Sequence, residues 1–207
     1  MDLALFDFDG TITRRETMPD FLRAAVRPFR LAVGRLVFAP LVLGYRLGIV
    51  PGSAVRAALC RFAFRGIPVA ELERHGALFA THFLPTVLRP QAMARIDWHR
   101  ARGDRVVIVS GGLDVYLSHW TRDQGLALLC SSLEQRGDRL TGRYQGAQCV
   151  RAEKVRRVRA AYPTGAYSRV YAYGDSPEDL DLLAMADEAY YRWQPLDRDE
   201  ARTGSDP

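Results

Sequence analysis

The chain has 207 residues, of which 48% are hydrophobic and 26% charged, a composition typical of one large domain or of one domain with a modest insertion. Its three cysteines, Cys60, Cys130 and Cys149, are odd in number and far apart, which argues against a disulfide framework or a zinc site. The net charge of +5 comes from basic residues interspersed with acids, so we expect a solvated surface or a small anionic substrate, and no nucleic acid partner. The start of the chain lacks the pattern of a secretory signal, so a cytoplasmic protein is expected.

The first predicted element is a short buried strand at residues 3–6, which leads into acidic residues. From about residue 14 to residue 90 the sequence has helical character and no convincing strand, and we interpret this stretch as an inserted helical cap. Within it, residues 29–50 are unusually apolar, but their longest apolar run is far shorter than the roughly 20 residues of a membrane span. We expect two buried cap helices that meet near Pro40. The alternative is a surface that contacts membrane or admits a lipid-like substrate.

Downstream of residue 90, predicted helices and strands alternate. This pattern predicts an α/β fold with a doubly wound parallel-sheet, Rossmann-like core, formed by residues 1–13 and 91–207 around the helical cap at residues 14–90. A β-hairpin at residues 133–146 is expected to extend from the sheet edge, and the tail beyond about Trp193 is expected to fray. The helices are expected at residues 92–102, 114–124, 152–162 and 177–186, and the strands at residues 105–110 and 169–174.

Acidic residues follow two of the predicted strands, at the carboxyl ends where function is expected in such a sheet. Asp7 and Asp9 are two residues apart in an extended segment, so both can face one pocket while Phe8 packs away from it. This pair alone is equally typical of a polar strand end, but Asp175 adds a carboxylate at the end of another strand. Carboxylates gathered in this way favour Mg²⁺, which can also bind a substrate phosphate.

Asp179 lies near the predicted start of a helix whose N-cap would be Ser176, and we weigh a capping role equally with support of the metal site. Candidate phosphate ligands are Ser110 and the backbone N–H of Gly111, in the Ser-Gly-Gly segment that closes the second strand. Lys154 is the single lysine among 29 basic residues, which indicates a role that needs a compact charge. An ordinary turn and a surface lysine are the alternatives.

Other charged and titratable residues are weaker candidates. Three arginines of the cap are interpreted as sharing one helix face, which favours a solvated stripe first and a contact with an anion second. Four histidines have no spacing that would pair them as metal ligands on one helix, so surface or cap positions are expected. The arginines are Arg56, Arg61 and Arg65, and the histidines are His75, His82, His99 and His119.

Four segments, taken in order along the chain, resemble the four motifs of the haloacid dehalogenase superfamily. The cap directly after the first motif and the hairpin resemble subfamily IB, the phosphoserine phosphatase-like branch. This resemblance implies a Mg²⁺-dependent phosphomonoester hydrolase that acts through an aspartyl-phosphate. The segments are Asp7-Phe8-Asp9-Gly10-Thr11-Ile12-Thr13, Ser110-Gly111-Gly112, Lys154 and Gly174-Asp175-Ser176-Pro177-Glu178-Asp179.

The same resemblance implies a role for each motif residue. Asp7 would be the nucleophile and a metal ligand, and Asp175 would be a further metal ligand. Asp9 would be the general acid and base, and would also bind the metal through its backbone carbonyl. The phosphate would be held by Ser110, Lys154 and the backbone amide of Gly111.

The substrate is less strongly indicated. Glu16 stands at the spacing after Asp7 where phosphoserine phosphatases carry a glutamate that binds the substrate amino group, although a helix-start acid is an equal interpretation. We expect a small phosphorylated metabolite. The apolar cap is similar to those of bacterial phosphatases that act on phosphatidylglycerophosphate, so a lipid phosphate is the alternative substrate. A non-catalytic protein that binds anions or nucleic acid is a further alternative, and the oligomeric state is left open.

Overall fold

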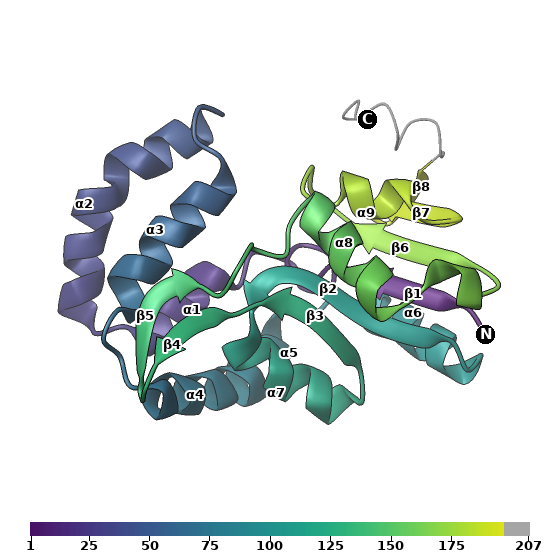
Figure 1. Ribbon diagram of the computed structural model, residues 1–207, viewed down its shortest axis with the longest axis horizontal. Helices are drawn as coiled ribbons and strands as arrows, with labels where there is room; N and C mark the ends of the chain where they lie inside the picture. Colours follow the sequence, from purple (N-terminus) through teal and green to yellow (C-terminus); the bar gives the residue numbers. More distant parts are fainter. Residues whose placement is uncertain (197–207) are drawn as a thin grey trace.

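A six-stranded, mostly parallel sheet forms the centre of the computed structural model, which describes residues 1–196 (Figure 1). The strand order is β3-β2-β1-β6-β7-β8, and only β8 runs antiparallel to its neighbour. In the sheet, Phe6 pairs with Ile108 and Tyr173, so the residues that follow these strands emerge at one level. The strands are β1 (Leu3–Phe6), β2 (Arg105–Leu113), β3 (Ala127–Ser131), β6 (Val170–Gly174), β7 (Glu188–Tyr191) and β8 (Gln194–Leu196).

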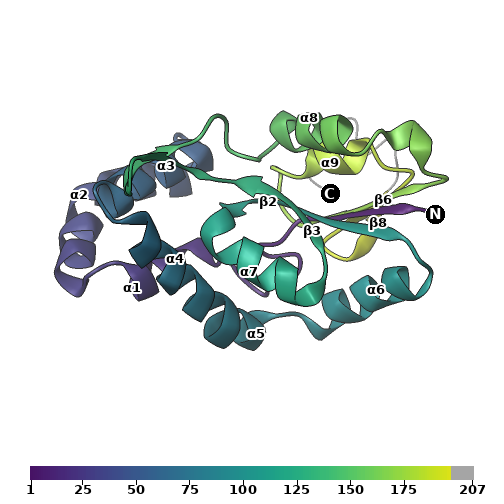
Figure 2. The same ribbon diagram turned by 60° about the horizontal axis from the view of Figure 1, so that its bottom comes forward.

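Helices cover both faces of this sheet, as Figure 2 shows. Alternate residues of β1 point to opposite faces: Leu3 and Leu5 pack in the apolar cluster with α8 and α9, whereas Ala4 and Phe6 pack in the cluster with α6 and α7. The doubly wound α/β core that the sequence predicts is therefore confirmed. Its elements are α6 (Pro90–Ala101), α7 (Asp114–Gln124), α8 (Ala152–Ala161), a short 3₁₀ turn (Thr164–Ala166) and α9 (Leu180–Ala184).

Between β1 and α6 the elements are helices joined by loops, and the β-structure there is limited to two isolated β-bridges. Its helix α4 lies directly on the core helix α7, because a Cβ at Gly76 would come within 1.9 Å of the Val115 carbonyl oxygen. In contrast, α2 and α3 stand apart from the sheet (Figure 1). The predicted domain boundaries at residues 14 and 90 stay a prediction. The helices are α1 (Met18–Ala25), α2 (Pro28–Arg46), α3 (Gly52–Phe64), α4 (Val69–Leu78), a π-helical turn (Phe79–Phe83) and α5 (Leu84–Val87).

The most apolar stretch of the chain forms one helix, α2, so the expected pair of buried helices is wrong. Pro40 lies inside α2 and cannot donate the hydrogen bond that would reach the carbonyl of Leu36. Because Leu36 is 81% exposed, water can satisfy that carbonyl. Gly34 is the one buried residue of α2. Within the described residues, α2 is the one helix that is long and apolar enough to cross a membrane by length and composition, which by itself is weak evidence.

The predicted hairpin is present as β4 (Leu133–Arg136) and β5 (Arg139–Tyr144), and it follows the edge strand β3. It does not project freely, because it packs against α3. Gly142 has a positive φ of 77°, and a Cβ there would come within 2.9 Å of the Arg61 backbone. The Leu140 carbonyl accepts a hydrogen bond of 2.8 Å from the Gly66 N–H just beyond α3. The hairpin thus connects the core sheet to the helices above it.

Two further expectations are wrong. Fraying from Trp193 onward does not hold for Gln194–Leu196, which form β8; the rest of that predicted tail lies outside the described residues. His99 is not at the surface but fully buried under the sheet. Its Nδ1–H donates to Asp104 Oδ2 at 2.9 Å, and its Nε2 accepts from the Tyr173 hydroxyl at 2.9 Å. Burial lowers the pKa of His99, although Asp104 opposes this shift.

Candidate active site

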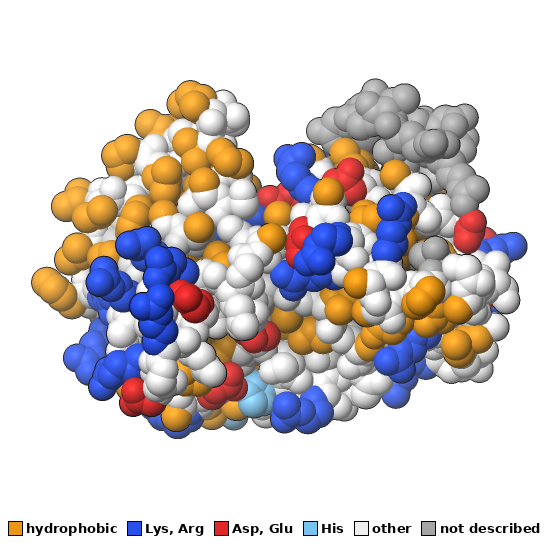
Figure 3. All heavy atoms as spheres, in the orientation of Figure 1, with side chains coloured by type: hydrophobic (Ala, Val, Ile, Leu, Met, Phe, Trp, Pro, Cys, Tyr) orange, Lys and Arg blue, Asp and Glu red, His pale blue; other side chains and the backbone are white. Residues whose placement is uncertain are grey.

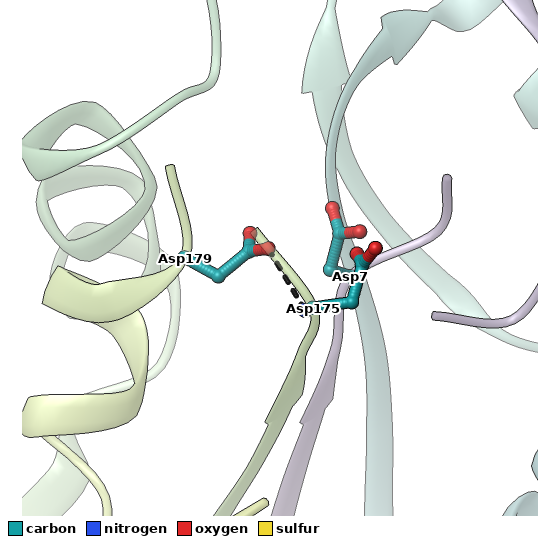
Figure 4. Close-up of side chains that lie close together, drawn as sticks. All are labelled: Asp7, Asp175 and Asp179. Atoms are coloured by element: carbon teal, nitrogen blue, oxygen red, sulfur yellow. Dashed lines mark hydrogen bonds between the residues drawn. The ribbon is translucent and has the colours of Figure 1, made fainter. Parts of the chain in front are cut away.

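Three carboxylates meet at the carboxyl edge of the sheet (Figure 4). Asp7 follows β1 and Asp175 follows β6, and these two strands are neighbours in register. Asp179 faces them from the start of α9. One oxygen from each of the three lies within 4.8 Å of the others. The sheet therefore brings Asp7 and Asp175 together as the sequence predicts.

The electrostatics of this cluster favour a cation. Burial, together with repulsion from Asp179, raises the pKa of Asp7 well above its ordinary value, and the attraction of Lys154 only partly opposes this. Burial and Asp179 also raise the pKa of Asp175. A hard divalent cation would remove this penalty, and carboxylate oxygens are the ligands that Mg²⁺ prefers. The donor set of the cluster thus fits the metal that the sequence predicts.

Lys154 is at the centre of the site, with its side chain almost completely buried. Its Nζ donates hydrogen bonds to Asp7 Oδ1 at 2.5 Å and to Asp179 Oδ1 at 2.6 Å. Burial alone would lower the pKa of Lys154, but Asp179 and Asp7 outweigh it and the net shift is upward, so the ammonium stays charged. The single lysine of this arginine-rich chain is therefore not a surface residue.

Asp9 lies beside the cluster and faces a different partner. Its Oδ1 accepts hydrogen bonds from the Thr17 N–H at 2.8 Å and the Thr17 hydroxyl at 2.6 Å. Burial raises the pKa of Asp9 to about 6, although these hydrogen bonds oppose the shift. Phe8 points away and packs on Trp120, with ring centroids 5.1 Å apart. Asp7 and Asp9 therefore line one cavity, as their spacing predicts.

The loop after β1 approaches Asp175 closely. Gly10 has a φ of +82°, and a Cβ at this position would lie 2.1 Å from Asp175 Oδ2. Only glycine combines this backbone conformation with so short an approach. The next residue, Thr11, donates its hydroxyl to Asp175 Oδ1 at 3.1 Å. Gly10 of the first motif is thus required by the position of the Asp175 carboxylate.

The expected helix start at Ser176 is wrong, because α9 begins at Leu180 and residues 176–179 form a turn. The Asp179 carboxylate folds back onto that turn and makes no side-chain cap of α9. Its Oδ2 accepts from the N–H groups of Asp175 at 3.2 Å and Ser176 at 3.1 Å, and from the Ser176 hydroxyl at 2.8 Å. Asp179 thereby holds the loop that carries Asp175, while its other oxygen receives Lys154.

The Ser-Gly-Gly segment forms another wall of the cavity. It belongs to β2, which runs to Leu113, three residues beyond the predicted end, with an irregular register between Ser110 and Leu113. Ser110 is buried, and its hydroxyl oxygen accepts a hydrogen bond of 3.0 Å from the Gly112 N–H. Gly111 lies against Val150, since a Cβ there would come within 2.9 Å of Val150 Cγ1. Ser110 and Gly111 therefore line the same cavity as the carboxylates.

Arg56 is a residue that the sequence interpretation placed wrongly. It lines the cavity from α3, and its Nη2 donates to both carboxylate oxygens of Glu178, at 2.7 and 2.8 Å. On an α-helix Arg61 and Arg65 are one turn apart, but Arg56 is rotated by about 140° from Arg61, so the three do not share a face. Arg56 instead lies one turn from the buried Cys60, and that spacing was a signal for a partly buried arginine.

Glu16 completes the mouth of the cavity. It precedes α1 and does not begin the helix, whose N-cap position is Thr17. Desolvation of its carboxylate and repulsion from Asp9 raise the pKa of Glu16 to about 7. Every residue that the sequence singled out for the site, with the exception of Asp175, lines this one cavity, and Asp175 is close to two of the lining residues, Asp7 and Asp179.

Comparison with known proteins agrees with this geometry. The sequence model of the haloacid dehalogenase-like hydrolases matches residues 4–184. Protein CicA of Caulobacter vibrioides is 35% identical over 193 residues, which cover 92% of this chain and 85% of CicA. A crystal structure of a protein of unknown function from Bordetella pertussis Tohama I has a TM-score of 0.79 at 24% identity, covering 92% of this chain and 89% of that one. A substrate-bound phosphoserine phosphatase has a similar fold, with a TM-score of 0.68 at 20% identity over 92% of this chain and 85% of that one. The chain belongs to the haloacid dehalogenase-like hydrolases.

Proposed function

We propose that this hydrolase is a Mg²⁺-dependent phosphatase that cleaves the phosphomonoester of a small phosphorylated metabolite through an aspartyl-phosphate. The observation that carries the proposal is the place of the Asp7 carboxylate. It lies close to two further carboxylates, accepts a hydrogen bond from the Lys154 ammonium, and lines a cavity that is also lined by Ser110 and Gly111. A nucleophile, a cation site and donors for phosphate oxygens are thus within reach of one another.

Mg²⁺ would be held by Asp7, Asp175 and the backbone carbonyl of Asp9. When bound, it would offset the charge of the carboxylates and of the phosphate oxygens. The upward pKa shifts of Asp7 and Asp175 support this assignment, because burial first and repulsion from Asp179 second both disfavour the ionised carboxylates that a cation would stabilise. Asp179 supports the site by fixing the loop of Asp175.

The chain's own residues suit each step of the reaction. A free oxygen of Asp7 attacks phosphorus as the bond from phosphorus to the ester oxygen breaks, and Asp9 gives its proton to that leaving oxygen. Asp9 then takes a proton from the water that attacks the aspartyl-phosphate, which releases inorganic phosphate and restores the Asp7 carboxylate. Lys154 orients Asp7 throughout and, with Ser110 and the Gly111 N–H, binds the phosphate oxygens.

The polar mouth of the cavity supports a small, charged leaving group. Glu16 and Arg56 place a carboxylate and a guanidinium there, and Glu178 anchors Arg56 across the cleft. Glu16 is suited to bind a substrate amino group.

The three free thiols of the described chain support a reducing, cytoplasmic setting. A lipid phosphate is the second candidate substrate, favoured by the exposed apolar helix α2.

The test is hydrolysis of p-nitrophenyl phosphate with Mg²⁺ and with EDTA, using Asp7→Asn. We expect this isosteric change to lower kcat by at least about 1,000-fold, since it removes the nucleophile. Asp123→Asn, on the exposed end of α7, makes the same chemical change away from the site and should be fully active. Acid quenching and mass spectrometry should find phosphate on the peptide that contains Asp7. Activity retained in Asp7→Asn would exclude the proposed nucleophile.

A panel of phosphoserine, sugar phosphates and lipid phosphates then ranks the substrates by kcat/KM. The non-catalytic alternative makes a different prediction. Salt-sensitive binding of nucleic acid without turnover of any phosphate ester would favour that alternative over a phosphatase.

A further inference from the structure

Helix α2 and the turn that follows it expose an unusual amount of apolar surface. Among the described residues, eight of the eleven exposed large hydrophobic side chains lie between residues 29 and 49. Phe29 and Leu36 are each 81% exposed. Figure 3 shows these hydrophobic side chains gathered over α2. We call them the α2 surface: Phe29, Val33, Leu36, Val37, Leu43, Tyr45, Leu47 and Ile49.

The segment that carries the α2 surface is rich in arginine, and acids outside it pair with two of these arginines, Asp20 with Arg23 and Glu178 with Arg56. Between Asp20 and Glu71 the sequence contains eight arginines and no acidic residue. Because the whole chain carries a net charge of only +5, the rest of the chain is net acidic, and the excess of positive charge is confined to this region. The arginines are Arg23, Arg27, Arg30, Arg35, Arg46, Arg56, Arg61 and Arg65.

An apolar groove lies behind the α2 surface. It has a volume of about 510 Å³ and runs between α1, α2 and α3. Phe38 and Leu59 are among its apolar lining residues, and three arginines, Arg23, Arg35 and Arg46, also line it. An apolar groove with guanidinium groups suits an acyl chain that ends in an anionic headgroup.

The α2 surface is next to the mouth of the candidate active site. A Cβ at Gly52, the first residue of α3, would lie 3.3 Å from the Tyr45 ring and 3.5 Å from a carboxylate oxygen of Glu178. Glu178 lines the active-site cavity and pairs with Arg56 across the cleft. The end of α2 and the entrance to the site therefore belong to one rim of the molecule.

We propose that the α2 surface docks on a bilayer that contains anionic phospholipids. Apolar side chains would enter the interface while the arginines beside them contact lipid phosphates. A second copy of the chain fits less well, because the arginines of two such segments would meet and neither segment has an acidic residue of its own. Nucleic acid would leave the apolar side chains unpaired with any apolar group. A spanning helix is disfavoured by Arg30 and Arg35 within α2 and by α3 packed along it.

The experiment measures co-sedimentation of the protein with vesicles of phosphatidylcholine alone and of phosphatidylcholine mixed with phosphatidylglycerol. We expect binding only to the mixed vesicles, and we expect it to weaken as salt is raised. Leu36→Glu should lower the affinity by at least about tenfold, since it places a charge where an apolar contact was. Leu78→Glu makes the same change at an exposed leucine on α4 and should bind as the unmodified protein does.

Arginine variants test the charge separately. Arg46→Gln, on α2, should lower vesicle affinity about fivefold, whereas Arg122→Gln, on the exposed end of α7, should not change it. The circular dichroism spectrum and Tm of each variant verify that it is folded. Asp7→Asn should bind vesicles normally, so vesicle binding and the proposed catalysis can fail independently.

Three results would overturn the proposal. One is the absence of binding to mixed vesicles at low salt, and another is equal binding by the Leu36 and Leu78 variants. The third is a concentration-dependent dimer, measured by light scattering, that Leu36→Glu abolishes, which would identify the α2 surface as an interface between copies.

Discussion

Replacing Lys154 by methionine should destabilise the protein strongly, because it removes the positive charge shared by two buried carboxylates. The side chains of Asp7 and Asp179 are 8% and 1% exposed, and each accepts a short hydrogen bond from Lys154 Nζ. Methionine has a similar length, so the main change is the lost ammonium. Breaking a buried ion pair by removing one partner costs about 3–5 kcal/mol. For a protein of this size, that corresponds to a fall in Tm of about 6–20 °C.

The loss of stability in Lys154→Met should become larger as pH rises. Burial already raises the pKa of Asp7, and without Lys154 this pKa should rise further. A carboxyl group whose pKa is higher in the folded state is most favourable when protonated, so the variant should lose stability as pH rises above the ordinary aspartate pKa. Thermal unfolding followed by circular dichroism, in EDTA and at several pH values, measures this. The Tm difference from the unmodified protein should be smaller at pH 5 than at pH 8.

The matched control is Arg156→Met, on the same helix. Arg156 pairs with Glu153 at the surface, so its loss should change Tm little at any pH. Lys154→Arg should have almost no activity toward p-nitrophenyl phosphate, because the site encloses a compact ammonium and a guanidinium is broader. If Lys154→Met unfolds at the same temperature as the unmodified protein, Lys154 does not neutralise the carboxylates and the electrostatic reasoning is wrong.

Three more substitutions test other parts of the structure. Gly10→Ala should lower kcat at least about a hundredfold, measured with p-nitrophenyl phosphate, because its Cβ would displace Asp175. Arg56→Gln should lower kcat/KM about tenfold, mainly through KM, because it breaks the pair with Glu178 across the substrate entrance. Burial keeps His99 neutral, so the unfolded chain binds more protons and the free energy of unfolding falls as pH falls below about 6.5. In His99→Gln, urea unfolding should show a smaller fall.

Controls separate these effects from general ones. Gly103→Ala shares the positive φ of Gly10 but has no atom within 4 Å of the added Cβ, so it should lose stability without losing activity. Arg61→Gln, on the exposed face of α3, should leave KM unchanged. His82→Asn, at an exposed position, should keep the full pH dependence of unfolding. If a variant and its control have equal effects, the explanation given for that variant is wrong.

Local sequence was sufficient to place most of the candidate site. The strands before Asp7 and Asp175 are short apolar runs, and the period of two along an extended chain puts Asp7 and Asp9 toward one cavity and Phe8 into the core. Because parallel strands of an α/β sheet end at one edge, strand order along the chain was enough to expect these acids to meet. Lys154 was recognised by its rarity and by its place among the four motif segments.

Tertiary structure decided what packs against each element. Whether the apolar helix α2 is covered depends on the neighbours that lie over it, and no residue pattern within α2 reveals that only Gly34 would be buried. The roles of Asp179 and Arg56 likewise come from partners far along the chain, Lys154 and Glu178. Capping and solvation are local alternatives that a single stretch of sequence satisfies equally well. Only the folded chain selects between them, because a charged side chain takes the position in which a partner from another part of the chain stabilises it.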